Sequence, residues 1–278
     1  MLMYWTHERI APWQSDQWDQ QMRDQLRPNA YLRMIENRFV TSEESFIDMD
    51  WWDACVDPGA KPVLHDPDLD VWLGLDASTK RDYSAIVGVT YADGKVVLAT
   101  HRVFKPSSDN PINFERDLEA SVLEYASAFS VREVRFDPRD MAATSQRLAD
   151  RGIRMVEYPQ TVDRLTDSST ALYDLVKGRN LVAYPDAEMR LAVSRAVAKE
   201  TTRGWRIAKE KVSHKIDVVV ALAMAAHAAV EAQRRDVITD AVPIMLFRES
   251  PWASFMAHGP EADESEPLHL GGLSAWQT

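Results

Sequence analysis

Three aspartates, Asp76, Asp137 and Asp217, are notable because each interrupts or adjoins an apolar segment of the chain. Asp76 lies in LGLDAS, Asp137 ends VREVRF, and Asp217 lies in KIDVVVALAMA. An ionised carboxylate in apolar surroundings is costly unless it is paired or binds a metal ion. Converging carboxylates need divalent cations, and two cations about 4 Å apart can clamp the attacking and leaving oxygens of a phosphodiester. Oxygen ligands favour Mg²⁺ or Mn²⁺ over zinc, so metal-dependent phosphodiester hydrolysis is the candidate chemistry.

Each aspartate taken singly also has a structural interpretation. Asp76 would cap a turn at the end of a strand. Asp137 would cap the helix expected to begin near Asp140, and Asp217 would be favoured by the dipole at a helix N-terminus. The three become informative together, because the predicted strands and helix can bring them to one place.

Two other residues lie close to these aspartates in the sequence. Asp82, in TKRDYS, is interpreted first as a turn residue, with an accessory role at the site as the alternative. His214 precedes Asp217 by three residues, so on a helix both side chains would point the same way. An imidazole there could shuttle protons or merely cap the helix, and we favour capping.

The charge distribution is uneven along the chain. The 278 residues carry a net charge of −11, which argues against a nucleic-acid partner, yet Arg132 to Ile216 has 17 Lys and Arg against 12 Asp and Glu. A patch of this kind is either a solvated face or a phosphate-binding surface. Its position next to the predicted carboxylates favours DNA binding, and the candidate residues are Lys199, Arg203, Arg206, Lys209, Lys211 and Lys215.

The elements that must position these residues begin with an apolar strand at 71–77. Strands at 84–91 and 96–104 flank the turn Ala92-Asp93-Gly94 and predict an antiparallel meander. Strands at 131–136 and 153–156, separated by a helix, predict parallel additions to the same sheet. The pattern indicates an α/β fold of three layers with a mixed five-stranded central sheet.

Apolar periodicity and capping residues predict the remaining elements. A short strand is expected at 181–184 and a β-hairpin at 197–199 and 205–208, around Thr201 to Gly204. The predicted helices are 15–26, 114–129, 140–149, 168–177, 186–196 and 214–234.

Several classes of protein are disfavoured by composition. Cys55 is the only cysteine, which excludes an internal disulfide or a thiolate zinc cluster. No apolar run reaches the roughly 18 residues of a membrane span, and the first ten residues lack the pattern of a secretory signal. We therefore expect no membrane partner and a location in the cytoplasm.

Three segments together resemble the nuclease motifs of tailed-phage terminase large subunits: VWLGLDASTKRDYSAIVGV, VREVRFDPRDMA and WRIAKEKVSHKIDVVVALAMAAH. The upstream segment RPNAYLRMIENRFVTSEESFIDMDWWDAC is similar to the region joining the packaging ATPase to the nuclease in that family. The resemblance implies a ribonuclease-H-like nuclease domain at 66–235. It also implies a linker-like N-terminal arm at 1–65 and, with the prolines beyond Asp236, a flexible C-terminal tail at 236–278.

By the same resemblance, Asp76, Asp137 and Asp217 match the family's metal-binding acids and imply two-metal cleavage of concatemeric double-stranded viral DNA during packaging. No G-x-x-x-x-G-K-[ST] phosphate loop occurs in the sequence, so the packaging ATPase would be a separate chain or a missing part. The implied partners are this ATPase, the terminase small subunit and, through the tail, the portal.

Two alternatives remain open. One is another enzyme of the same fold, such as a junction resolvase or a transposase-like strand-transfer enzyme, because these share the acidic residues. The other is a non-catalytic assembly module of the packaging machine, in which the acids serve only structure.

Overall fold

A computed structural model describes residues 11–38, 44–77, 83–106, 112–139, 141–201, 204–211 and 214–241. Contacts divide the chain into two units, Met1–Arg234 and Arg235–Thr278. The described residues of the second unit, 235–241, are the last turns of the long C-terminal helix. The predicted tail beyond them lies outside the described residues. All that follows concerns the first unit.

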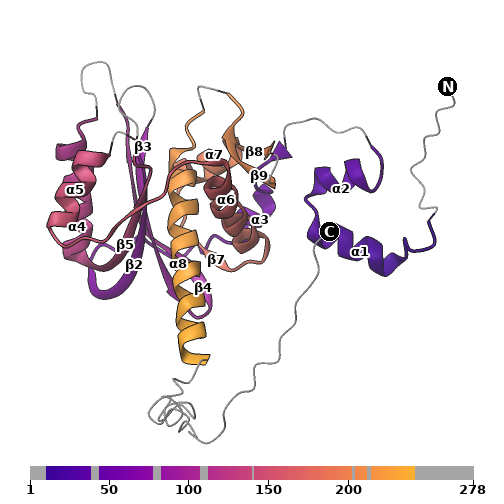
Figure 1. Cartoon of the computed structure of the whole chain (residues 1–278), viewed down its shortest axis with the longest axis horizontal. Coiled ribbons are helices and arrows are strands. Elements are labelled where there is room, and N and C mark those ends of the chain that lie inside the picture. Colours follow the sequence, from indigo (N-terminus) through magenta and orange to yellow (C-terminus); the bar gives the residue numbers. More distant parts are fainter. Residues whose placement is uncertain are drawn as a thin grey trace, which may run out of the picture. The chain divides into compact units, whose positions relative to one another are not determined.

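A mixed sheet forms the centre of this unit, with its described strands in the order β6-β5-β2-β3-β4-β7 (Figure 1). The three strands β2, β3 and β4 are antiparallel, whereas β5, β6 and β7 join by parallel pairing. Their bounds are β2 (Asp66–Asp76), β3 (Ser84–Ala92), β4 (Lys95–Phe104), β5 (Phe129–Phe136), β6 (Met155–Glu157) and β7 (Leu181–Val182).

The mixed sheet confirms the predicted class, but the predicted count of five strands is wrong, because this sheet has six strands among the described residues. The additional strand is β7, whose two residues pair with Val96 and Val97 of β4. The predicted hairpin between β3 and β4 is confirmed. Asp93 (φ 51°) and Gly94 (φ 78°) both have positive φ, as a two-residue type I′ turn requires.

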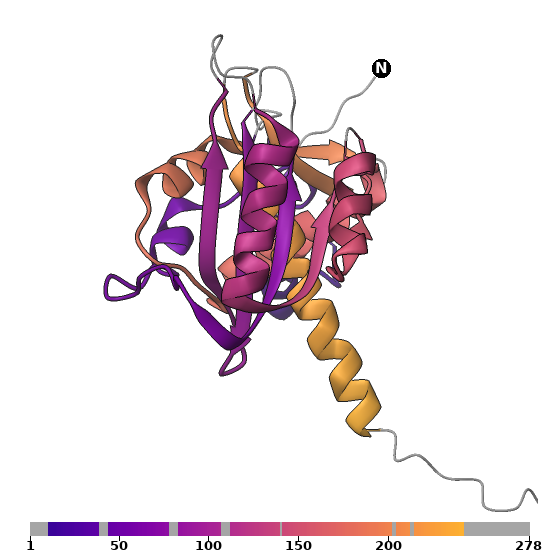
Figure 2. The same ribbon diagram turned by 90° about the vertical axis from the view of Figure 1, so that its left-hand side faces the viewer.

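Helices cover both faces of the sheet, which gives the predicted three layers (Figures 1 and 2). One face packs on α4 (Ala120–Ala128) and α5 (Ala142–Asp150) through a core that includes Leu73 and Leu75. The other face packs on three helices through a core that includes Trp72. These are α6 (Val162–Lys177), α7 (Ala187–Arg195) and α8 (Asp217–Ala241).

Three helix boundaries differ from the prediction. The helix expected at 114–129 begins as a π-helix, Phe114–Glu119, before α4. α6 begins at Val162 rather than 168, because the Thr161 side chain caps it by accepting from the Arg164 N–H. α8 begins at Asp217 rather than 214 and continues to Ala241.

The N-terminal residues pack against the same unit. They form α1 (Asp16–Gln25), α2 (Pro28–Met34), β1 (Glu44–Ser45) and α3 (Met49–Asp53). The predicted hairpin is present as β8 (Ala196–Thr201) and β9 (Gly204–Lys209), and β1 pairs with β8 to make a second sheet in the order β1-β8-β9.

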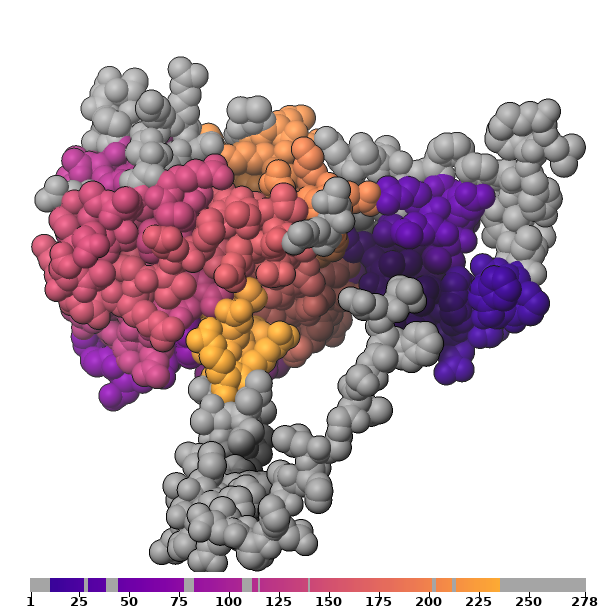
Figure 3. All heavy atoms as spheres, in the orientation of Figure 1, coloured from indigo at the N-terminus to yellow at the C-terminus, as the bar shows by residue number. Residues whose placement is uncertain are grey.

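The long helix α8 is a core element for most of its length. From Asp217 to Ala229 its residues are buried, apart from a half-buried Val220. Figure 3 shows its later turns reaching the surface as a yellow patch. None of the described helices combines the length and apolar character needed to cross a membrane. α8 is therefore positioned by packing on the sheet.

Candidate functional site

Asp76 and Asp137 lie at the carboxyl ends of two neighbouring parallel strands. Leu75 of β2 pairs in register with Phe136 of β5, so the two aspartates follow at the same edge of the sheet. Parallel strands present functional side chains at this edge. Asp137 is buried, and its Oδ1 accepts a hydrogen bond of 3.2 Å from the Arg139 backbone N–H.

Asp217 is brought to this edge by the start of α8, where it is the first helical residue and is buried. The helix can lie directly on β2 because Gly74 has no side chain. A Cβ on Gly74 would lie 2.1 Å from the Ala221 carbonyl oxygen and 2.8 Å from the Ala225 nitrogen. This backbone contact, one helical turn from Asp217 and two residues from Asp76, fixes the approach of the two acids.

A buried ion network also ties β5 to α8. Arg135, two residues before Asp137, is 3% exposed and donates through Nη1 to His227 Nδ1 (3.0 Å) and through Nε to Glu133 (2.8 Å). Its Nη2 donates to Glu231, one turn after His227. Burial lowers the pKa of His227, and the neutral imidazole is the form that accepts from Arg135. The strand that carries Asp137 is thereby fixed to the helix that carries Asp217.

The three acids influence one another electrostatically. The pKa of Asp76 is raised to about 8, first by burial and then by the charge of Asp217, with a smaller contribution from Asp137. Lys209 and a hydrogen bond from Gln160 act in the opposite direction. Such a rise means that Lys209 and Gln160 only partly compensate the negative charge of ionised Asp76.

Two neighbours of the acids come from other elements. The Gln160 side-chain amide donates to Asp76 Oδ1 at 3.0 Å, and Lys209 Nζ lies 3.8 Å from Asp217 Oδ1. Sequence analysis missed Gln160, which lies in the loop after β6. The available signal was that β6 runs parallel to β5, so a polar side chain beyond its carboxyl end lies at the same edge of the sheet.

The two residues proposed as accessory to the site have different outcomes. Asp82 lies outside the described residues. His214 precedes α8 instead of forming part of it, so the argument that it shares a helical face with Asp217 is wrong. Its Nδ1 lies 3.8 Å from Glu210. Ile216 directly precedes the first helical residue, and its carbonyl accepts from the Val219 N–H.

The predicted DNA-binding residues divide between two faces of the hairpin. Lys199 and Arg206 are cross-strand partners and share one face. Lys209 is on the opposite face of β9, with the buried Ile207, and points toward the acids. Lys211 is exposed and Lys215 half-buried beside the start of α8, whereas Arg203 lies outside the described residues.

The donor set fits a divalent cation in charge and in ligand type. In the described part of the chain, no group of three or more acidic, histidine or cysteine side chains is close enough as it stands to hold a metal ion. The fit rests instead on three carboxylates that share one edge and on the raised pKa of Asp76, which a nearby cation would reverse. Carboxylate oxygens suit Mg²⁺ or Mn²⁺.

The family comes from a comparison with known protein families. Residues 112–233 match the model described as the terminase large subunit, endonuclease domain. This part of the chain is similar to the endonuclease domain of terminase large subunits. Asp137 and Asp217 lie inside the matched region, and Asp76 precedes it.

Solved terminase structures share the fold. The chain is similar to the large terminase of bacteriophage HK97, at 17% identity and a TM-score of 0.58, over 79% of this chain and 52% of that one. It is also similar to the large terminase nuclease of thermophilic phage G20c, at 16% identity and a TM-score of 0.53, over 65% of this chain and 96% of that one.

A second structure of the G20c nuclease, described as having bound magnesium, matches with 17% identity and a TM-score of 0.51, over 67% of this chain and 98% of that one. The chain thus spans about half the length of the HK97 large terminase and nearly the whole of the G20c nuclease. No curated protein sequence matches the chain significantly. The predicted resemblance to terminase nucleases and the predicted ribonuclease-H-like fold are confirmed, with the strand count corrected.

Proposed function

We propose that the terminase nuclease domain in this chain is a metal-dependent DNA endonuclease, with Asp76, Asp137 and Asp217 as its metal ligands. The observation that carries the proposal is the position of the three aspartates. Asp76 and Asp137 lie at the carboxyl ends of paired parallel strands, and Asp217 begins the helix that packs directly on β2 at Gly74. The terminase nuclease crystallised with magnesium supports the choice of a divalent cation.

Two divalent ions, when bound, would supply Lewis-acid stabilisation of a phosphodiester and a water activated for attack. The protein's own residues hold and orient the acids. Gln160 orients the Asp76 carboxylate by its hydrogen bond, and Lys209 balances part of the charge on Asp217. Lys199 and Arg206, side by side on β8 and β9, would hold DNA phosphates.

The substrate that we propose is the concatemeric double-stranded DNA of a virus, cut during packaging in the host cytoplasm. The proposed organisation is an arm at 1–65, the nuclease at 66–235 and a tail at 236–278. The packaging ATPase, on another chain or in another part of the protein, would bring the DNA. The terminase small subunit and the portal are the other proposed partners, the latter through the tail.

The test is cleavage of supercoiled plasmid by the purified chain in EDTA, Mg²⁺ or Mn²⁺. We expect nicking or linearisation only with metal, and a loss of at least about a hundredfold in Asp76→Asn, which removes a metal-binding charge. The matched control is Asp70→Asn, in the same strand, where the half-exposed carboxylate lies 3.7 Å from Arg132. This variant should cleave like the wild type.

Three results would contradict the proposal. Cleavage that is insensitive to EDTA would show that the reaction does not depend on a metal ion. Equal activity of Asp76→Asn and the wild type would show that this site is not catalytic and that the acids have a structural role. If the chain alone does not cleave, the same comparison is made with a terminase ATPase added. A lack of cleavage there with either metal would also reject the nuclease.

A further inference from the structure

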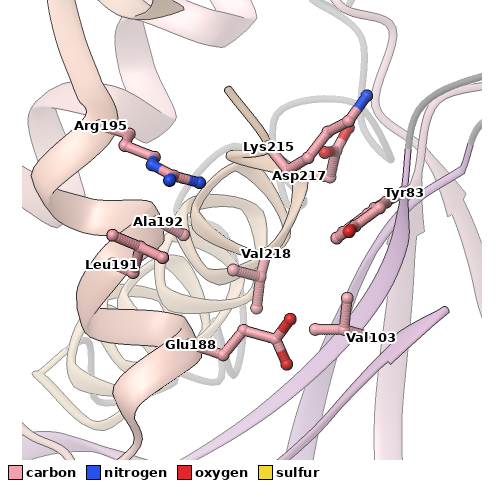
Figure 4. A pocket seen from close by; sticks show the side chains of 9 residues that line it. All are labelled: Tyr83, Val103, Glu188, Leu191, Ala192, Arg195, Lys215, Asp217 and Val218. Carbon is pink, nitrogen blue, oxygen red and sulfur yellow. The ribbon is translucent and has the colours of Figure 1, made fainter. Parts of the chain in front are cut away.

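A pocket adjoins Asp217, beside the edge where the three acids meet. Its volume is about 160 Å³, and its walls come from α7, from the end of β4 with Tyr83 before β3, and from the start of α8. Figure 4 shows Arg195 reaching into it from α7, Tyr83 on the opposite side and Val218 between them. Because Asp217 also lines it, any occupant would lie next to the proposed metal site.

The size of the pocket limits what can enter. A cavity of about 150 Å³ accommodates benzene in an engineered protein, so this one has room for a single base or sugar. A duplex or a folded peptide segment is too large. One nucleotide of a strand, with its phosphate at the mouth, has the right dimensions.

One side of the pocket is apolar and aromatic. The Tyr83 ring and Val103 face α7, whose Leu191 is 46% exposed at the pocket. Cations surround the ring, since Lys215 Nζ lies 5.6 Å and Lys105 Nζ 5.9 Å from its centroid. An aromatic ring beside cations is how proteins hold the bases and phosphates of a nucleic-acid strand.

The other side supplies a cation that has no partner among the described residues. Arg195 is half-buried and makes no hydrogen bond or ion pair with any residue that the structure describes. The acid on the same helix, Glu188, is already paired with Lys105. A half-buried guanidinium without a carboxylate favours an anionic ligand, and its planar donors fit a phosphate.

We propose that this pocket is a subsite for the DNA nucleotide adjacent to the scissile phosphate. Arg195 holds the phosphate of that nucleotide, and Tyr83, Val103 and Leu191 contact its sugar or base. The subsite rests on the proposed nuclease, since it needs the cleavage site to be at Asp217. A free mononucleotide shares this chemistry, and the experiment separates the two.

The first measurement is binding of fluorescent duplex and single-stranded oligonucleotides to the full chain in EDTA. Arg195→Ala should weaken binding about tenfold and lower the dependence of log Kd on log salt by about one, as the loss of one phosphate contact does. Arg195→Lys should restore the salt dependence. Lys95→Ala removes an exposed positive charge at the far end of β4 and should change binding little.

The second measurement locates the DNA by photo-cross-linking of oligonucleotides that carry 5-iodouracil, followed by mass spectrometry. We expect a cross-link at Tyr83 that disappears in Tyr83→Leu and weakens in Leu191→Glu, both variants being checked for folding by circular dichroism. Competition by free dCMP as effective as that by DNA would assign the pocket to free nucleotides and overturn the strand subsite.

Failure of the subsite and failure of the nuclease give different results. The subsite alone is overturned if the chain cleaves plasmid with Mg²⁺ but gives no cross-link at Tyr83, and if Arg195→Ala and Lys95→Ala bind DNA with the same affinity. A chain that never cleaves overturns the nuclease, and the subsite, which depends on it, is overturned with it.

Discussion

At Asp76, burial and the charges of the other two aspartates both raise the pKa. Its pKa of about 8 exceeds the usual 3.8, so between these values the folded protein binds a proton that the unfolded chain releases. The contribution of Asp76 to the free energy of unfolding therefore falls as the pH rises from about 4 to about 8. In EDTA, the protein has this cost in full only above about pH 8.

We therefore predict that Asp76→Asn stabilises the metal-free protein at about pH 8. The neutral amide removes the repulsion, and we expect a gain of about 2 kcal/mol, or roughly 4–8 °C in Tm. The advantage should vanish near pH 4, and Mg²⁺ should raise the Tm of the wild type but not that of the variant. Thermal unfolding followed by circular dichroism is the measurement. Equal melting temperatures at pH 8 would contradict the electrostatic account.

For single residues, the sequence predicts the position of those whose environment is set by neighbours in the chain. Asp76 and Asp137 stand at the ends of apolar strands, and that pattern places them at one edge of the sheet. Gln160 carries no such pattern, because its contact with Asp76 comes from a loop distant in sequence. His214 was misplaced because helical spacing was extended three residues before the helix begins.

Among the elements, the contact of α8 with β2 decides whether the acids can meet. Gly74 lies against backbone atoms of α8, which cannot move aside as the end of a flexible side chain can. Sequence analysis recognised both elements, but it did not predict their contact, since a glycine in a strand has several explanations. For the same reason β7 was not counted in the sheet, because a two-residue strand has too little pattern to indicate its partner.

Gly74→Ala should accordingly impair the site more than the fold. Its Cβ would push α8 away from β2, at a cost of about 1–3 kcal/mol for overpacking, and would move Asp217 away from Asp76. We expect plasmid cleavage to fall by at least about tenfold at a temperature where the variant remains folded. Gly59→Ala is the control, because a Cβ there makes only an ordinary contact of 3.4 Å with Asp57. Unchanged cleavage by Gly74→Ala would show that the helix position is not critical.

For the first unit as a whole, a buried arginine contributes to the contact between the N-terminal segment and the nuclease. Arg27, 9% exposed, has its guanidinium carbon 4.7 Å from the Tyr173 ring centroid and 4.3 Å from that of Trp205. It donates to the carbonyls of Ser45 (2.8 Å) and Phe46 (3.1 Å). The sequence indicated an arm here, but not this contact, because its partners lie far along the chain.

Arg27→Ala should therefore destabilise the unit by about 2–4 kcal/mol, through the loss of two hydrogen bonds and two cation–π contacts. Urea unfolding would measure the change. Arg23→Ala is the comparison, since Arg23 also lies over a tyrosine ring, 4.2 Å from the centroid of Tyr31, but its side chain is 50% exposed. A smaller loss is expected there, and equal losses would mean that the burial of Arg27 is unimportant.

The contact of α8 with Gly74 also has a consequence for the order in which the protein is made. A ribosome produces β2 and β5 before α8, so Asp76 and Asp137 have been synthesised while Asp217 is still to be translated. Asp217 reaches them only when α8 lies on the finished sheet. If the three acids act together, an incomplete nascent chain cannot cut DNA, and the activity arises in one step as the domain closes.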